Sequence, residues 1–276
     1  MDKHLLYRLK NSALNAGVEL KTVLMDEIQS FFLEEFYKNS SSIGSVLFGG
    51  GRFRHINESI RFSIDLDFFE TKDFEYEKVL DFISGKFIKL LENRFGISSR
   101  VINVPPWQIS DNVKTIRLLV FDNENDFSQI EIDFDFIKRQ PAYECERKLL
   151  KNVVIVTSND AEALEEKLIS IYERRPIKIR DIFDFWYYRN LVKKLNYESI
   201  NKKIMDRCIS EDSIKKQLLD FSKHREYYIK EIKNIIRSCG EKRDEVQNLL
   251  KLDINIIIGY VINTTNEYIL QGTKDK

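Results

Sequence analysis

Two short stretches of the chain hold closely spaced carboxylates. In "SIDLDFF", Asp65 and Asp67 alternate with apolar residues. In "QIEIDFDFI", Glu131, Asp133 and Asp135 alternate in the same way. Because successive side chains of a strand point to opposite faces, each stretch would present its acids on one side. Two like charges about 4 Å apart repel by roughly 4 kcal/mol at an effective dielectric of about 20, so a cation is expected beside them. That cation is either a metal ion or a neighbouring arginine.

The apolar positions of both stretches predict a shared buried face. The residues expected to point into the core are Ile64, Leu66 and Phe68 in the first stretch, and Ile130, Ile132, Phe134 and Phe136 in the second. If the two strands are neighbours, up to five carboxylates share the opposite face. Magnesium prefers oxygen ligands, and two such ions about 3.5–4 Å apart stabilise an in-line phosphoryl displacement. A solvated sheet face is the alternative interpretation of either stretch alone.

Three consecutive glycines, Gly49, Gly50 and Gly51, follow a short apolar run and precede residues 52–57, which can form a short helix. Glycine lets backbone N–H groups approach an anion closely, and a helix N-terminus adds partial positive charge. The triplet therefore either cradles a phosphate or forms only a tight turn. The thirteen residues between Gly51 and Asp65 leave room for a short helix and a returning strand, so cradle and carboxylates can meet.

The composition limits which kinds of metal site and which kinds of binding partner the chain can have. Lys+Arg and Asp+Glu are both 44, so any nucleic acid must meet a local basic patch rather than a basic protein. Three scattered cysteines and three scattered histidines argue against a disulfide framework and against a Cys- or His-based metal cage. The start lacks the apolar run of a signal peptide, and the uncharged stretch Ile254–Asn266 is too short and polar to span a bilayer. We expect a cytoplasmic protein with no membrane partner.

The carboxylates and glycines need a sheet backed by helices, and the hydrophobic pattern predicts one. Helical spacing occurs within 2–37 and over 73–95, ending near Gly96, and "KNSSSIG" at 38–44 is typical of a linker. The predicted strands are 45–51 (running into the glycines), 62–69, 98–104, 113–121, 128–137 and 152–157.

From about Ala161 the composition becomes helical throughout. The predicted helices are 161–175, 179–194, 212–238 and 242–262. We therefore predict an α+β fold, with a mixed sheet flanked by helices and a helical C-terminal domain. The predicted domains are a helical N-terminal segment at 1–40, an α+β domain at 41–158 and the helical domain at 159–276.

The order of these motifs resembles the nucleotidyltransferase superfamily with the DNA polymerase β-like fold. Within it, the chain is similar to the AbiEii/AbiGii-type toxins of abortive-infection and toxin–antitoxin systems. The first motif of that family, glycines and then Arg-x-Ser-x-Asp-Leu-Asp-Phe, appears as "GGG" and as "RFSIDLDF" at 61–68. The second motif, a helix lysine followed by arginine and a basic-Asp-x-x-Asp segment, appears in "ALEEKLISIYERRPIKIRDIFDFWY". The resemblance covers about residues 44–190.

The resemblance implies a Mg²⁺ (or Mn²⁺) site and an NTP site. Its metal ligands would be Asp65, Asp67 and Asp133, with Asp133 also helping to deprotonate the attacking hydroxyl, while Glu131 and Asp135 share its face. The implied catalytic set adds Lys167 and Asp181. The implied nucleotide-binding residues are Gly49, Gly50, Gly51, Arg52, Arg61, Ser63 and Lys167. The family's small hydroxyl residue is replaced here by Gly51, so Arg52 or Arg61 is expected to compensate.

Several neighbouring residues have two interpretations. Lys167 is either a solvated helix lysine or a phosphate ligand oriented by Asp181, and Asp184 is either a partner or a helix-surface charge. The cations Arg174, Arg175, Lys178 and Arg180 either form a solvated face or contact triphosphate or RNA. The aromatic residues Phe183, Trp186, Tyr187 and Tyr188 are expected in the core, and His55 is expected to be structural.

Three functions are compatible with these motifs. The first is a metal-dependent nucleotidyltransferase that moves a nucleoside monophosphate from an NTP to an acceptor and releases pyrophosphate. The resemblance would make it the toxin of a pair, with a cognate antitoxin and with the tRNA 3′ end as the first acceptor to test. The second is a non-catalytic nucleotide-binding regulator or partner-binding module. The third is a metal-dependent nuclease. Sequence identifies neither the acceptor nor the preferred nucleotide.

Overall fold

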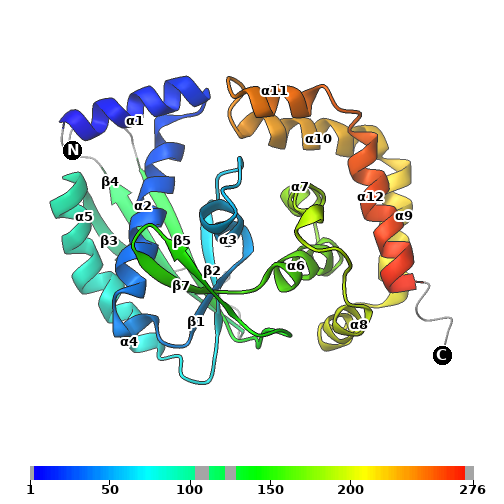
Figure 1. The fold of residues 1–276 in the computed structure, drawn as a ribbon, viewed down its shortest axis with the longest axis horizontal. Helices are drawn as coiled ribbons and strands as arrows, with labels where there is room; N and C mark the ends of the chain where they lie inside the picture. Colours follow the sequence, from blue (N-terminus) through cyan, green and yellow to red (C-terminus); the bar gives the residue numbers. More distant parts are fainter. Residues whose placement is uncertain (1–2, 103–111, 122–128, 271–276) are drawn as a thin grey trace. The chain divides into compact units, whose positions relative to one another are not determined.

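The computed structural model describes residues 3–102, 112–121 and 129–270 (Figure 1). The chain divides into two compact units. The sheet unit comprises Met1–Ser158 and Cys239–Arg243, and the helical unit comprises Asn159–Ser238 and Asp244–Lys276. Each unit is described below by itself.

The sheet unit is built on a mixed, seven-stranded sheet with the order β3-β4-β5-β2-β1-β7-β6. Its strands are β1 (Ser45–Phe48), β2 (Asp65–Glu70), β3 (Ser98–Ile102), β4 (Val113–Phe121), β5 (Ile130–Ile137), β6 (Glu146–Leu150) and β7 (Val153–Thr157). Strand β2 pairs antiparallel with β1 and parallel with β5, and β1 runs parallel to β7. The mixed sheet and its helices confirm the predicted α+β class.

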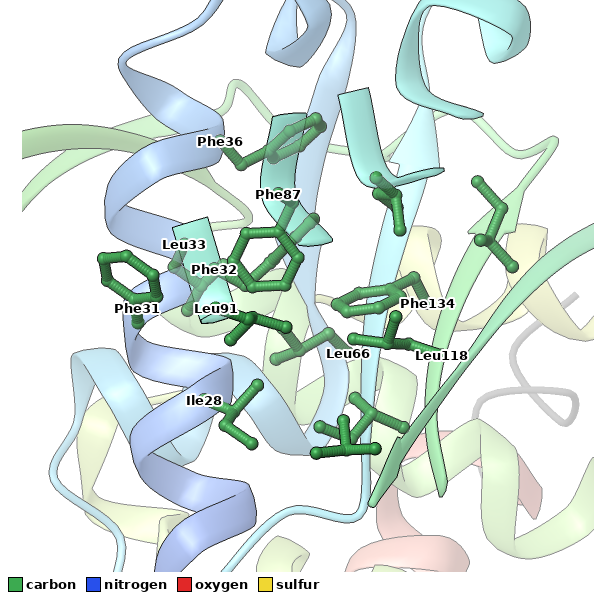
Figure 2. Close-up of a cluster of buried hydrophobic side chains, with 14 of the residues drawn as sticks. Ile28, Phe31, Phe32, Leu33, Phe36, Leu66, Phe87, Leu91, Leu118 and Phe134 are labelled. Atoms are coloured by element: carbon green, nitrogen blue, oxygen red, sulfur yellow. The ribbon is translucent and has the colours of Figure 1, made fainter. Parts of the chain in front are cut away.

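Helices cover one face of this sheet. They are α1 (Lys3–Ala16), α2 (Leu20–Tyr37) and a continuous run of α4 (Tyr76–Asp81), η2 (Phe82–Phe87, a π-helix) and α5 (Ile88–Phe95). Figure 2 shows Phe32 and Phe36 of α2 beside Phe87 and the strand residues Leu66 and Phe134. The ring centroids of Phe32 and Phe134 are 4.2 Å apart, and both side chains are fully buried. Burying each such side chain contributes about 1.5–3 kcal/mol, so this face holds the unit together.

Most of the predicted elements of this unit are confirmed. The helix expected over 73–95 begins at Tyr76 and ends at Phe95, and it is capped by Gly96, whose backbone φ of +61° is left-handed. The predicted strands 98–104 and 128–137 correspond to β3 and β5, and residues 103, 104 and 128 lie outside the described part of the chain. Strand β6 was not predicted, because "ERKLL" carries three charges in five residues.

The predicted burial of Ile64 is wrong. Leu66 and Phe68 are fully buried as expected, but Ile64 is 57% exposed. Strand β2 begins only at Asp65, so Ile64 lies before the pleated segment and does not follow its alternation. On β5 the expected alternation is confirmed, with Ile130, Ile132, Phe134 and Phe136 buried.

A half-buried histidine makes the stability of the sheet unit depend on pH. His55 lies near the end of α3 (Gly49–Ile56), beside a cavity of about 250 Å³ that Asp26 and Arg54 also line. Burial lowers the pKa of His55 to about 4, helped by Arg54 and Lys151 and opposed by Asp26. In an unfolded chain the pKa is about 6.5, so between pH 6.5 and 4 only the unfolded state binds this proton. Stability is therefore lost as pH falls through this window.

Replacing His55 by glutamine should remove part of that pH dependence. We expect the free energy of unfolding of the original chain to fall between pH 7 and pH 5 by about 1–2 kcal/mol more than that of His55→Gln. Urea titrations at the two pH values measure the difference. His224, whose side chain is 63% exposed, supplies the control, because His224→Gln should keep the original pH dependence. Equal pH dependence in His55→Gln and the original chain would contradict the assignment.

The helical unit consists of helices and short helical turns over its described residues. They are α6 (Asp160–Glu173), α7 (Ile179–Tyr187), η4 (Arg189–Leu191), α8 (Tyr197–Asp206), α9 (Glu211–Lys223), α10 (Arg225–Ser238), α11 (Asp244–Leu250), α12 (Asn255–Thr265) and η5 (Asn266–Leu270). The helix expected over 212–238 is broken at His224. The helix expected over 242–262 is also broken, and the Asp253 carboxylate accepts a hydrogen bond from the Asn255 backbone N–H where α12 starts. In the described part of the chain, no helix has the length and apolar character needed to cross a membrane.

The interior of the helical unit contains a network of buried charges. Helix α6 turns Glu162, Glu165 and Glu166 inward. Lys203 of α8 is 6% exposed, and its Nζ lies 2.8 Å from Glu165 Oε2 and 3.1 Å from Glu162 Oε1. Arg207, just after α8, forms an ion pair with Glu166. The two cations allow three carboxylates to be buried, because an unpaired buried charge is strongly disfavoured.

Candidate active site

The glycine triplet connects β1 directly to α3. The helix begins at Gly49 itself, not at Arg52 as expected, so the glycines form its first turn. The first-turn N–H groups of a helix have no partner within the helix and can bind an anion. Gly49 has a left-handed φ of +69°, and a Cβ there would lie 2.2 Å from Asp67 Oδ2. The turn therefore packs against a predicted metal ligand and has no room for a side chain.

Arg61 and Ser63 lie beside the second glycine. A Cβ on Gly50 would be 2.8 Å from Ser63 Oγ and 3.1 Å from a guanidinium nitrogen of Arg61. Ser63 Oγ donates a hydrogen bond of 2.8 Å to the Asp65 carbonyl, and Arg61 donates one of 2.9 Å to the Phe62 carbonyl. The structure thus brings together the glycines, Arg61 and Ser63 of the predicted nucleotide-binding set.

Arg52 takes a different position. Its side chain is fully buried, and its Nε donates a 2.8 Å hydrogen bond to the Ser158 carbonyl. A second nitrogen donates to the Asn57 side chain at 2.6 Å. The first bond ties α3 to the chain that follows β7, and the second joins the start of α3 to its own C-terminal end. The contacts of Arg52 support a structural role, and Arg61 is the cation that lies at the glycine turn.

The acidic strands are neighbours in parallel register. Asp65 pairs with Asp133, and Asp67 pairs with Asp135. On its other side, β5 pairs antiparallel with β4, which places Thr115 opposite Asp135 and Arg117 opposite Asp133. The acid-bearing face therefore holds two rows of side chains that cross strands β2, β5 and β4. One row is Asp67, Asp135 and Thr115, and the other is Asp65, Asp133 and Arg117.

Three of these carboxylates can hold a metal ion together. Asp65, Asp67 and Asp135 are half-buried, and one oxygen from each lies within 4.8 Å of the others. Carboxylate oxygens are the ligands that Mg²⁺ and Mn²⁺ prefer, so the donor set fits a hard divalent cation. Among the described residues, the structure thus brings together Asp65 and Asp67 as predicted, with Asp135 in the third place.

Asp133, which was predicted as the third metal ligand, instead forms an ion pair with an arginine. Arg117 donates from Nε and from a terminal nitrogen to the two oxygens of Asp133, each at 2.7 Å. The hydrogen bond to Asp133 raises the pKa of Arg117, opposed by burial. A bidentate guanidinium pair is among the stronger hydrogen-bonded contacts in proteins. Arginine is therefore the cation beside Asp133, whereas Asp135 belongs to the cluster that could hold a metal ion.

The second predicted motif lies within the helical unit. Lys167 of α6 is 7% exposed, and its Nζ lies 2.8 Å from Asp181 and 3.0 Å from Asp184 on α7. Arg174 donates to the other oxygen of Asp181 at 2.9 Å. Burial raises the pKa of Asp181, but Lys167 and Arg174 outweigh it and hold the pKa below its usual range. Asp184 is fully buried, so its interpretation as a helix-surface charge is wrong.

The remaining cations of that motif differ in their surroundings. Arg175 donates to the Gln217 side chain and, at 2.6 Å, to Ser213 Oγ. Lys178 is exposed, and Arg180 is half-buried in the first turn of α7. Of the neighbouring aromatic residues, Phe183, Trp186 and Tyr188 are buried as expected, and Tyr187 is half-buried.

Thr115 is the contact that sequence reasoning missed. Its hydroxyl donates a 2.5 Å hydrogen bond to Asp135 Oδ1. The alternation of "VKTIRLLVF" predicted a strand but gave no sign that its polar residues face the acids. Asp135 itself was marked by its position on the same face as Asp133.

In this fold, a glycine turn at a helix start packs on a metal-compatible acidic cluster of a mixed sheet. The solved structure of a putative nucleotidyltransferase from H. pylori is similar to it, with 13% identity, a TM-score of 0.50 and coverage of 92% of this chain and 98% of that one, so the chain has a nucleotidyltransferase fold. The nucleotidyltransferase toxin MenT4 from Mycobacterium tuberculosis is 19% identical, with a TM-score of 0.48 and coverage of 72% and 68%. No curated protein matches the chain in sequence.

The family is identified by sequence. Residues 33–245 match the family described as "Nucleotidyl transferase AbiEii toxin, Type IV TA system". The chain belongs to this family of toxin nucleotidyltransferases, which confirms the predicted family and the predicted class of enzyme.

Proposed function

We propose that the chain transfers a nucleoside monophosphate from an NTP to an acceptor hydroxyl, in a metal-dependent reaction that releases pyrophosphate. The observation that carries this proposal is the cluster of Asp65, Asp67 and Asp135 beside the glycine turn. Membership of the AbiEii family supports the nucleotidyl-transfer chemistry. Oxygen ligands support Mg²⁺ or Mn²⁺ as the cofactor.

Each part of the site has a task in this reaction. The N–H groups of the glycine turn, with the Arg61 guanidinium, bind the phosphates of the NTP. Asp65, Asp67 and Asp135 would hold the divalent cation, which when bound would neutralise phosphate charge and lower the pKa of the attacking hydroxyl. Asp135 takes the role that the resemblance gave to Asp133 and accepts the proton of that hydroxyl.

The proposal also names an acceptor and a protein partner. The family's place in type IV toxin–antitoxin systems supports a cognate antitoxin. We propose the tRNA 3′ end as the acceptor and the cytoplasm as the place of action. We propose that Lys167 binds phosphate and that Asp181 orients Lys167. The 2.8 Å distance between Lys167 Nζ and Asp181 Oδ1 supports the role of Asp181. The basic residues Arg174, Arg175, Lys178 and Arg180 are the proposed RNA or phosphate contacts.

Incubation with labelled NTPs, Mg²⁺ and total RNA should transfer label to a small set of RNAs. Chelation with EDTA should reduce transfer by about a hundredfold or more, because the cation supplies several kcal/mol of charge stabilisation, and excess Mg²⁺ should restore it. Gel electrophoresis of the products identifies the acceptor, and label confined to tRNA supports the proposed one. Transfer that persists in EDTA would contradict the metal-dependent reaction. Loss of intact RNA without added NTP would indicate a nuclease instead.

A further inference from the structure

We propose that Thr115 is a positioning residue for Asp135, and that Thr115 and Arg117 together determine which carboxylate of β5 binds the cation. The inference rests on the proposed function and deepens it. It concerns two residues of β4, a strand that β5 separates from β2, and neither the glycine motif nor the Asp-x-Asp motif includes them.

The two β4 side chains make different contacts with β5. Thr115 donates one hydrogen bond, 2.5 Å long, to one oxygen of Asp135. Arg117 donates two hydrogen bonds, each 2.7 Å long, and contacts both oxygens of Asp133. Each pair consists of residues directly opposite one another in the antiparallel ladder. Directly opposite side chains share a face and lie close, so both contacts follow from the register of β4.

The chemical consequences of these contacts are opposite. The Thr115 hydroxyl is neutral and brings no charge to Asp135, and a carboxylate can accept further contacts beyond this one. The bond restricts the rotation of the carboxylate and so holds it in an orientation suited to a cation. A guanidinium cancels the charge of Asp133 and occupies both of its oxygens. A metal ion would have to compete with Arg117 for the charge of Asp133.

The pattern also sets the charge of the site. Asp65 and Asp133 are neighbours in register, so a free Asp133 would add a fourth carboxylate to the cluster. With Arg117 in place, the cluster that could hold a cation consists of three carboxylates, Asp65, Asp67 and Asp135. Partners of metal ligands typically change metal affinity by roughly ten- to a hundredfold when they are removed.

Mn²⁺ binding without nucleotide measures the positioning role separately from catalysis. The full chain is titrated with Mn²⁺, and the free ion is quantified by electron paramagnetic resonance. Thr115→Val keeps the shape of the side chain and removes the hydroxyl, so it should weaken Mn²⁺ binding by roughly ten- to a hundredfold. Thr115→Ser restores a hydroxyl and should bind within about threefold of the original chain. Thermal unfolding confirms that each variant is folded.

A double variant tests the role of Arg117. Asp135→Asn should lose Mn²⁺ binding, and adding Arg117→Gln should regain part of it, because Asp133 is released as a substitute ligand. Equal Mn²⁺ binding by Thr115→Val and the original chain would overturn the positioning role, and no regain in the double variant would overturn the role of Arg117. Asp67→Asn separates these failures from failure of the proposed site. If Asp67→Asn binds Mn²⁺ as the original chain does, the cluster itself is not a metal site.

Discussion

Replacing Asp135 by asparagine should abolish nucleotidyl transfer, whereas the same change at Asp133 should leave most of it. Asp135 belongs to the cluster with Asp65 and Asp67, while Asp133 is held by two hydrogen bonds from Arg117. Loss of a ligand removes charge stabilisation worth several kcal/mol, which corresponds to about a hundredfold or more in rate. Initial rates of label transfer at saturating Mg²⁺ and NTP measure the effect.

Asparagine is the suitable substitution, because it keeps the size of aspartate and removes the charge. Asp67→Asn serves as the positive control and should be as inactive as Asp135→Asn. Asp133→Asn should retain activity to within about fivefold, since the amide oxygen can still accept from Arg117. Our assignment would be contradicted if Asp133→Asn were as inactive as Asp67→Asn while Asp135→Asn remained active. Asp133 would then be the third metal ligand.

Replacing Lys203 by methionine should strongly destabilise the helical unit. Lys203 lies 2.8 Å from Glu165 and 3.1 Å from Glu162, and all three side chains are buried. Methionine fills similar space but leaves these carboxylates without their cation. Breaking a buried ion pair by removing one partner costs about 3–5 kcal/mol. Urea unfolding followed by circular dichroism at pH 7 measures the loss in the free energy of unfolding.

The adjacent lysine supplies a matched control. Lys202 lies on the same helix but is exposed, so Lys202→Met should change the free energy of unfolding by no more than about 0.5 kcal/mol. A double change of Lys203 and Glu165 to methionine should recover part of the lost stability, because both members of one pair are then removed. Similar stabilities for Lys202→Met and Lys203→Met would show that the buried network contributes little.

The parts of the fold that depend on local pattern were predictable from sequence. The alternation in β5 identified its buried residues, and the spacing of α2 identified a helix that packs on the sheet. Helix α8 was missed because its buried side includes Lys203, which looks like a solvated residue until its acidic partners on α6 are known. Ile64 was wrongly predicted to be buried because the alternation of a sequence does not show at which residue the strand begins.

The candidate site was predictable as a set of carboxylates but not in its final selection. Asp133 and Asp135 share a face, so the sequence of β5 gives no reason to prefer either. The preference comes from Thr115 and Arg117, which precede their partners by 20 and 16 residues. Their influence depends on which strand lies beside β5 and in what register, and this is set by tertiary pairing rather than by local sequence.

The lack of a side chain at Gly51 connects the glycine turn to the interior of the sheet unit. A Cβ at this position would lie 2.4 Å from Leu66 Cδ2, and Leu66 is fully buried between its neighbours. A serine or threonine at position 51 therefore requires a different side chain or rotamer at position 66. A side chain at position 51 would therefore act on the buried core through Leu66 as well as on the glycine turn.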